Sequence, residues 1–147
     1  MGKFTEAIMG LVVGDAVGVP FEFRKRDTFT ADDMTGYGTY GLPAGTWSDD
    51  SSMTLATVYS IADSGKVNPE AIMMSFWNWY YHADFTPYGE VFDVGNTTRQ
   101  AIYRYANAFP LSTCGGRTER DNGNGALMRI LPLAFYPGMV GMMYVQF

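Results

Sequence analysis

The sequence predicts an all-α fold. Apolar residues recur at intervals of three and four in several stretches, which is the spacing of helices that bury one face. Asparagine, serine and proline precede these stretches and glycine follows them, as at helix ends. We find no stretch that alternates apolar and polar residues as a half-buried strand does, no internal repeat and no low-complexity segment.

Length and composition bound the classes of protein that the chain can represent. Its 147 residues suit one domain, residues 1–147, and a hydrophobic content of 47% argues against disorder. A net charge of -5 without a long basic run argues against nucleic acid as a partner. The single cysteine, Cys114, excludes an internal disulfide and fits a cytoplasmic location. Glu6 and Asp15 interrupt the apolar N-terminus, so we expect neither a signal peptide nor a membrane span.

The first helix is expected over residues 4–23, with a break at Pro20. Glu22 should therefore lie just beyond the helix, where its side chain is free to point into a site. Residues 27–45 follow as a long loop rich in Gly, Thr and Tyr, and loops of this length commonly carry function.

The central helix is expected over residues 49–64, with Gly65 closing it. Two interpretations of its start remain open. In the first, Ser48 or Asp49 is the N-cap, and the acidic side chains only complement the helix dipole. In the second, the oxygens of Ser48, Asp49 and Asp50 converge on a hard cation, because the irregular geometry of a helix start lets neighbouring side chains meet. Such ligands favour Mg²⁺ or Mn²⁺ over zinc.

The third helix should open with Asn68 as cap and Pro69 at its first position, and run to His82. It is apolar nearly all round, so we expect burial on more than one side and interpret its aromatic residues as core. His82, the sole histidine, should interact favourably with the negative end of the helix dipole. Because no nucleophile elbow is present, a Ser/His/Asp hydrolase is disfavoured.

The fourth and fifth helices are expected over residues 97–108 and 126–135. Asp93 lies just before the fourth. The fifth follows a Gly-Asn-Gly sequence at residues 123–125, which is interpreted either as a turn capped by Asn124 or as a helix start whose free backbone N–H groups hold an anion. Residues 139–147 have no polar face to balance their apolar side chains.

Three blocks of the sequence together resemble the ADP-ribosylglycohydrolase family. The first is GLVVGDAVG at residues 10–18 with Glu22, and the second is MTGYG at 34–38 leading into GTWSDDSSM at 45–53. The third is GNGALMR at 123–129 with a following Pro-Leu pair. All three occur in the family's order and spacing, and the match extends to about residue 137.

The resemblance implies the family's all-α, orthogonal helical bundle, two Mg²⁺ or Mn²⁺ ions, and cleavage of the bond between ADP-ribose and an arginine or serine. ADP-ribose or an ADP-ribosylated protein would be the partner. By position, the resemblance implies these roles: Ser48, Asp49 and Asp50 as metal ligands, Glu22 as the acid near the reacting centre, Asp93 as base or metal contact, and Gly123, Asn124 and Gly125 as the ADP-ribose-binding loop.

The chain departs from the family in length. Members are much longer, and their second half carries a Gly-Asp-Thr-Asp-type motif that nothing here matches. We therefore expect a truncated domain, equivalent to the N-terminal half, with impaired hydrolysis and a tendency to form a homodimer that covers apolar surface. The alternatives are a non-catalytic ADP-ribose-binding module and a structural relative.

Overall fold

The computed structural model describes residues 2–137, and these form helices and connecting turns. In chain order the elements are α1 (Lys3–Gly18), η1 (Val19–Phe21), α2 (Asp49–Ser64), α3 (Pro69–His82), α4 (Asn96–Ala106), α5 (Leu111–Cys114), η2 (Glu119–Asp121), η3 (Asn124–Ala126) and η4 (Leu131–Phe135), where η marks a 3₁₀-helix. Within residues 2–137 no strand forms, and an isolated bridge joins Tyr37 to Leu42. The predicted all-α class is confirmed.

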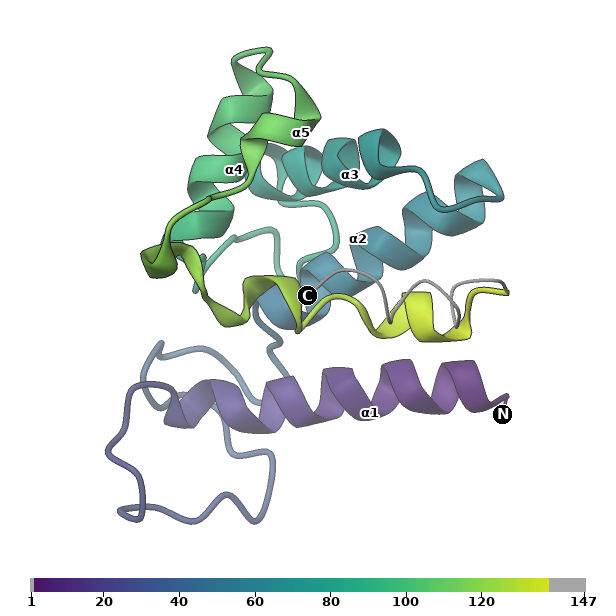
Figure 1. Cartoon of the computed structure of the whole chain (residues 1–147). Helices are drawn as coiled ribbons and strands as arrows, with labels where there is room; N and C mark the ends of the chain where they lie inside the picture. The colour runs from purple at the N-terminus through teal and green to yellow at the C-terminus, as the bar shows by residue number, and fades with distance from the viewer. Residues whose placement is uncertain (1, 138–147) are drawn as a thin grey trace.

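α2 runs obliquely between α1 and α3, and α4 lies at a steep angle to α3 (Figure 1). α2 packs on α3, α3 on α4, and α4 on α5, while α1 contacts α2 and η4. The long loop between η1 and α2 extends to one side, below and beyond the end of α1 (Figure 1). This layout brings the end of α1, the start of α2, the start of α4 and the η3 region to the same end of the molecule.

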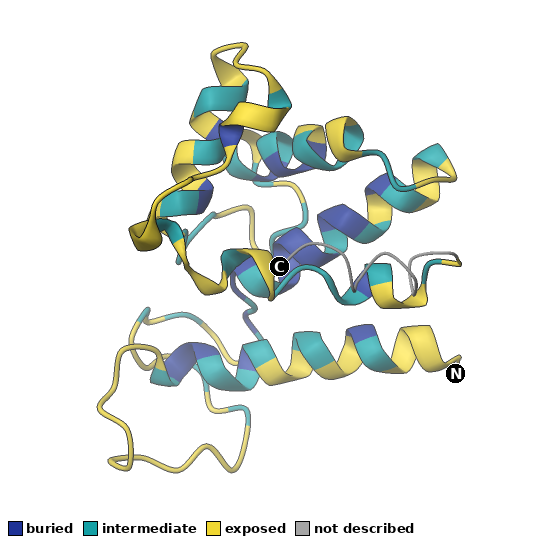
Figure 2. Ribbon diagram, viewed as in Figure 1, coloured by how far each residue is buried: buried dark blue, intermediate teal, exposed yellow. Residues whose placement is uncertain are grey.

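The core lies between α2, α3 and α4. Its buried apolar side chains are Met53, Ala56, Phe76, Trp79 and Ile102. α2 is the most central helix, and its first two turns are buried although they are rich in Ser and Thr (Figure 2). Buried hydroxyls there donate to carbonyls four residues earlier, as Ser52 does to Ser48 and Thr57 to Met53. A polar stretch can thus sit inside the fold.

The predicted boundaries of α2 and α3 are confirmed by their caps. Ser48 is the N-cap of α2, with its hydroxyl accepting from Asp50 N at 3.3 Å, and Gly65 ends the helix with a φ of 66°. Asn68 caps α3 by accepting from the backbone N–H groups of Glu70 and Ala71, and Pro69 occupies the first position.

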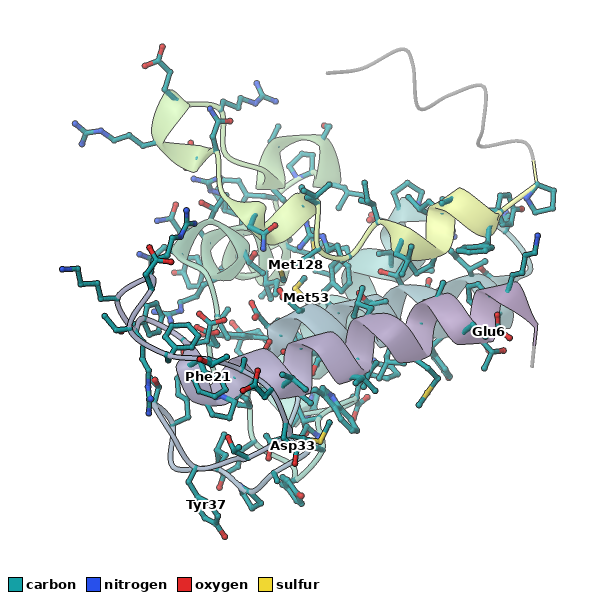
Figure 3. The ribbon with its side chains drawn as sticks, turned by 90° about the horizontal axis from the view of Figure 1, so that it is seen from below. Glu6, Phe21, Asp33, Tyr37, Met53 and Met128 are labelled. Atoms are coloured by element: carbon teal, nitrogen blue, oxygen red, sulfur yellow. The ribbon has the colours of Figure 1, made fainter. Side chains whose placement is uncertain are left out.

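The fifth predicted helix, over residues 126–135, is wrong. That stretch contains the end of η3, turn residues and then η4. Pro132 accounts for much of the difference, because its ring excludes an α-helical hydrogen bond and disfavours α geometry at the preceding residue. Met128, which precedes η4, instead packs against the core cluster that includes Met53 of α2, and both residues are labelled in Figure 3.

Two of the α3 aromatics confirm the expected core. Trp79 is 1% exposed and Phe76 is buried, and both belong to the apolar cluster that α3 forms with α2 and α4. Exposed apolar side chains lie on α1 and on α3: Met9 and Val13 are 48% and 46% exposed, and Met74 and Tyr81 are each 47% exposed. The expectation for residues 139–147 falls outside the described residues.

Residues Lys3–Phe21 form a continuous helical stretch with a mean hydropathy of 1.4, which by length and composition alone could cross a membrane. Core helices of water-soluble proteins and signal sequences pass the same test. Here the stretch contains Asp15, whose carboxylate binds the start of α2. The absence of a membrane span stays a prediction.

Candidate functional site

The site is built around the junction of α1 and α2. The carboxylate of Asp15, in the last turn of α1, accepts hydrogen bonds from the backbone N–H and the hydroxyl of Ser48 at 3.0 and 2.8 Å. It also accepts from the N–H and hydroxyl of Ser51 at 3.0 and 2.6 Å. An anion at this position satisfies N–H groups that the first turn of α2 leaves without intrahelical partners.

Sequence reasoning gave no role to Asp15. The sequence identified it only as an interruption of the apolar N-terminus and as one residue of the 10–18 block. The available signal was a carboxylate within an otherwise apolar helix, because such a group is rarely placed there without hydrogen-bond donors to receive it. Its donors lie 33 and 36 residues further along the chain, which local pattern cannot show.

Asp49 and Asp50, next along α2, hold protons more tightly than ordinary carboxyl groups. Burial, followed by the charges of Asp50, Asp93 and Asp15, raises the pKa of Asp49 to about 7. Burial, followed by the charges of Asp15 and Asp93, raises the pKa of Asp50 to about 6. The acids are therefore close enough to repel one another.

Glu22 and Asp93 join the same cluster from separate loops. Glu22 ends η1, and the pKa of its carboxyl is raised by partial burial and then by Asp93, Asp50 and Asp15. Asp93 has a φ of 56°, in the left-handed region that aspartate tolerates better than most residues. Burial and a hydrogen bond to Asp93 raise the pKa of Tyr40, which places this phenol beside the carboxylate.

Glu22, Asp49, Asp50 and Asp93 line one cavity of about 480 Å³. Its wall combines acids from three segments with the start of α4 and two glycine-containing turns. Among the residues predicted for the site, the cavity brings together Glu22, Asp49, Asp50, Asp93, Gly123, Asn124 and Gly125. Ser48 does not line it. This residue is buried beneath the cluster, with its hydroxyl donating to Asp15 and accepting from Asp50 N.

The glycine turn differs from the predicted helix start. η3 is a three-residue 3₁₀ turn with Gly123 as its N-cap, and the interpretation of Asn124 as side-chain cap is wrong. Gly125 packs on α4 so closely that an added Cβ would lie 2.8 Å from Thr98 Oγ1, whereas a Cβ on Gly123 would meet no atom within 4 Å. Gly125 is thus required for close packing on α4. Gly123 lines the cavity, and a side chain there would meet open space.

Asp121 also lines the cavity, but its carboxylate is already used. Its Oδ2 accepts from the N–H and the hydroxyl of Thr118, each at 2.8 Å, in a reciprocal capping box. These hydrogen bonds lower the pKa of Asp121. Asp121 therefore shapes the turn that carries Gly123 rather than adding to the acidic cluster.

Arg129 is a cation at the cavity that sequence reasoning did not single out. Its guanidinium lies 4.8 Å from the centre of the Phe76 ring, and Nη1 lies 3.6 Å from Met53 Sδ. Burial lowers its pKa and the charge of Asp49 raises it. The side chain thus places a positive charge beside Asp49 at the base of the acidic cluster.

The donor chemistry of the cluster fits a hard divalent cation in part. Every donor group is an oxygen. The pKa values of Asp49 and Asp50 are raised first by burial and then by the neighbouring carboxylates, and a bound positive charge would offset both effects. Within residues 2–137, however, no three Asp, Glu, His or Cys side chains are grouped closely enough to hold an ion. Asp49 and Asp50, above the buried hydroxyl of Ser48, therefore offer part of a coordination shell.

Comparison with known proteins gives consistent matches. The family model described as ADP-ribosylglycohydrolase matches residues 1–142. The chain is 34% identical over 136 residues to the ADP-ribosylarginine hydrolase Tri1 of Serratia proteamaculans, an alignment that covers 92% of this chain and 37% of that protein. It is 36% identical over 133 residues to the ADP-ribosyl-dinitrogen reductase glycohydrolase of Rhodospirillum rubrum, covering 87% and 42%.

A solved structure described as an ADP-ribosylglycohydrolase-related protein complex superposes with a TM-score of 0.73 at 33% sequence identity. The match covers 92% of this chain and 44% of that one. The chain therefore spans about two fifths of the length of the curated relatives and less than half of the solved structure.

Proposed function

The chain belongs to the ADP-ribosylglycohydrolase family, and we propose that its cavity binds ADP-ribose and forms the N-terminal part of a site that hydrolyses ADP-ribose linkages. An ADP-ribosylated protein is the proposed substrate, by analogy with the relatives named for ADP-ribosylarginine and for ADP-ribosyl-dinitrogen reductase.

One observation carries this proposal. Acidic side chains from η1, α2 and the loop before α4 line the same cavity as the glycine turn at residues 123–125. Three of these segments, those that carry Glu22, Asp49 and Gly123, belong to the blocks on which the family resemblance rests, although they lie far apart in sequence. A cavity of about 480 Å³ also falls within the range of small-molecule sites.

The proposed roles follow from where each group lies. Gly123 leaves space for close approach of a ligand to the backbone, as a diphosphate requires. Glu22 and Asp93 are the groups proposed to move protons: Glu22 at the bond being cleaved, and Asp93 as base toward the attacking water. The raised pKa of Glu22 suits a carboxyl that must carry a proton during part of the reaction.

Asp49 and Asp50 are proposed to hold Mg²⁺ or Mn²⁺ through their carboxylates. Ser48, the third ligand that the resemblance implies, does not line the cavity, and its hydroxyl donates to Asp15 and accepts from Asp50 N. When bound, such ions supply positive charge that orients ribose hydroxyls and activates water. Positive charge is needed at this place, because a cluster of carboxylates would otherwise repel an anionic diphosphate. Asp15 fixes the backbone from which these ligands project.

Residues 1–147 on their own are proposed to bind ADP-ribose without turning over substrate, because the partial shell at Asp49 and Asp50 leaves ligands to be supplied from elsewhere. The alternative, a non-catalytic ADP-ribose-binding module, uses the same cavity without metal. A purely structural relative would bind nothing there.

Isothermal titration calorimetry with ADP-ribose, with and without Mn²⁺, tests the proposal. We expect saturable binding that Mn²⁺ strengthens in the parent chain but not in the Asp49→Asn, Asp50→Asn double variant. Binding that is indifferent to Mn²⁺ favours the non-catalytic module. Absence of binding in both conditions contradicts the proposed function.

A further inference from the structure

A second cavity lies between α3, α4 and α5, at the top of the molecule as drawn in Figure 1. We call it the α3–α5 groove, and its principal lining residues are Glu70, Met74, Trp77, Tyr105, Phe109 and Leu111. Its volume is about 560 Å³, and it shares no lining residue with the cavity of the acidic cluster. α4 separates the two, with Asn96 and Thr97 at the first and Tyr105 and Ala106 at the groove.

The groove combines aromatic side chains with one carboxylate. Trp77, Tyr105 and Phe109 come from α3, α4 and the turn after α4, so they approach the space from different elements. Glu70 is exposed at the start of α3, and its charge contributes to the raised pKa of Tyr105, which places the carboxylate near the phenol. Aromatic faces beside a carboxylate form a surface that attracts organic cations.

Local contacts hold the Trp77 ring and the backbone of Glu70 before any ligand binds. The Trp77 ring packs against the rings of Tyr81 and His82 at centroid distances of 5.4 and 4.9 Å. The backbone N–H of Glu70 donates to the Asn68 cap at 3.1 Å, which anchors the residue in the first turn of α3. A pre-ordered surface loses less conformational entropy on binding.

The guanidinium of Arg104, the neighbour of Tyr105 in the chain, does not occupy the groove. Arg104, adjacent to Tyr105, directs Nη1 to the carbonyl oxygens of Cys114 and Gly115 at 2.9 and 3.3 Å. Elsewhere in the chain, guanidinium groups do lie over aromatic rings, as Arg129 does over Phe76 and Arg24 over Phe21. The groove is lined by aromatic residues and one carboxylate, and the side chain of Arg104 is directed elsewhere.

We propose that the α3–α5 groove binds the guanidinium or ammonium group of a basic side chain presented by a peptide. Ring faces of Trp77 and Tyr105 would contact the cation, Glu70 would balance its charge, and Met74 and Leu111 would cover the aliphatic stem. This proposal does not depend on the proposed hydrolase activity.

Titration of the ¹⁵N-labelled chain with Nα-acetyl-arginine amide tests the site by nuclear magnetic resonance. The neutral isostere Nα-acetyl-citrulline amide is the matched control. The chain has three tryptophans, so the indole N–H signals of Trp47, Trp77 and Trp79 report separately on three places. We expect a saturable shift of the Trp77 signal with the arginine compound and little response to the citrulline compound.

Glu70→Gln should weaken binding of the arginine compound about five-fold, as expected for loss of one close charge pair at a solvent-accessible site. Glu90→Gln, an exposed position outside the groove, should leave the affinity unchanged. An equal response to citrulline, an unchanged affinity in Glu70→Gln, or a shift confined to Trp47 beside the acidic cluster would each overturn the proposal. The comparison of arginine with citrulline on the parent chain holds even if a variant folds poorly.

Discussion

Asp15 and Ser48 are joined by two kinds of hydrogen bond: the Ser48 N–H lies 3.0 Å from Asp15 Oδ2, and its hydroxyl lies 2.8 Å from Oδ1. The same serine hydroxyl accepts from Asp50 N. One carboxylate in α1 therefore fixes both the backbone and the capping side chain at the start of α2. The position of Asp49 and Asp50 depends on this link, because both follow directly from the cap.

Asp15→Ala should destabilise the fold by about 2 kcal/mol, the order expected when hydrogen bonds to a charged group are removed and buried donors lose their partner. Urea unfolding followed by circular dichroism measures the change. Asp32→Ala, in the exposed loop before α2, is the matched control and should have an effect below about 0.5 kcal/mol. Equal effects of the two substitutions would contradict the assigned role of Asp15.

Stability should fall as pH rises from about 4 to 7 because of Asp49 and Asp50. Their pKa values are raised in the folded chain to about 7 and 6, from 3.8, so the folded state binds protons that the unfolded state has released. The stabilisation is fully present below the unfolded value and is lost as pH passes the folded values.

Because Asp50 is only half-buried, solvent weakens its share, and we expect the pair to account for about 2 kcal/mol over this range. Unfolding measurements at several pH values, compared with the Asp49→Asn, Asp50→Asn variant, isolate this contribution from other acids. A parent and a variant with the same pH dependence would show that these carboxyls are not crowded as described.

The local part of this arrangement was predictable, and the long-range part was not. Ser48, Asn68 and Gly65 set helix ends through contacts within a few residues, so pattern alone located α2 and α3. The prediction of a fifth helix was wrong because it relied on the apolar periodicity of residues 126–135 and gave too little weight to Pro132, which disfavours an α-helix.

The residues of the candidate site also fall into those that the sequence identified and those that it did not. Glu22 and Asp93 were identified through a family resemblance, and they do reach one cavity. Asp15 and Arg129 were given no role, because the partner of each side chain lies far away in the sequence. Ser48, which donates to Asp15, is 33 residues further along the chain, and the ring of Phe76 in α3 lies under the guanidinium of Arg129. Which polar residues of one segment face another cannot be read from periodicity.

Mn²⁺ should raise the midpoint of thermal unfolding if Asp49 and Asp50 bind it, since a ligand that binds only the folded state stabilises that state. With a partial shell we expect weak binding and a shift of a few degrees at millimolar Mn²⁺. The Asp49→Asn, Asp50→Asn variant should show no shift. The control is the Asp32→Asn, Asp33→Asn double variant, which changes an adjacent exposed pair in the loop. This control should show the same Mn²⁺-induced shift as the parent chain. Loss of the shift in this control, or its persistence in the first variant, would refute the assignment.

Gly123→Val and Gly125→Val should act differently. A side chain at position 123 enters open space in the cavity, so it should weaken ADP-ribose binding at least ten-fold with little loss of stability. A side chain at position 125 meets Thr98 Oγ1, so it should cost on the order of 1–3 kcal/mol in stability whether or not ligand is present. Calorimetry and thermal unfolding of both variants separate the two effects. If Gly123→Val binds as well as the parent, the turn is not part of the ligand site.

We expect self-association of residues 1–147 to involve α1, where Met9 and Val13 are each nearly half exposed and lie four residues apart on one helical face. The alternative is pairing through Met74 and Tyr81 of α3, which are each 47% exposed. Pairing of the α1 face between two copies would remove apolar surface from water, so light scattering should detect dimers or larger species.

Met9→Lys with Val13→Lys should shift the population to monomers, because paired copies would bring like charges together. Tyr103→Lys, at an exposed site on α4, is the control and should leave association unchanged. An assay on ADP-ribosyl-arginine should show background hydrolysis for all of these chains, since association through α1 adds no carboxylate to the cavity. Clear turnover by a monodisperse monomer would overturn the proposal of an incomplete site, because residues 1–147 would then supply every ligand that the reaction needs.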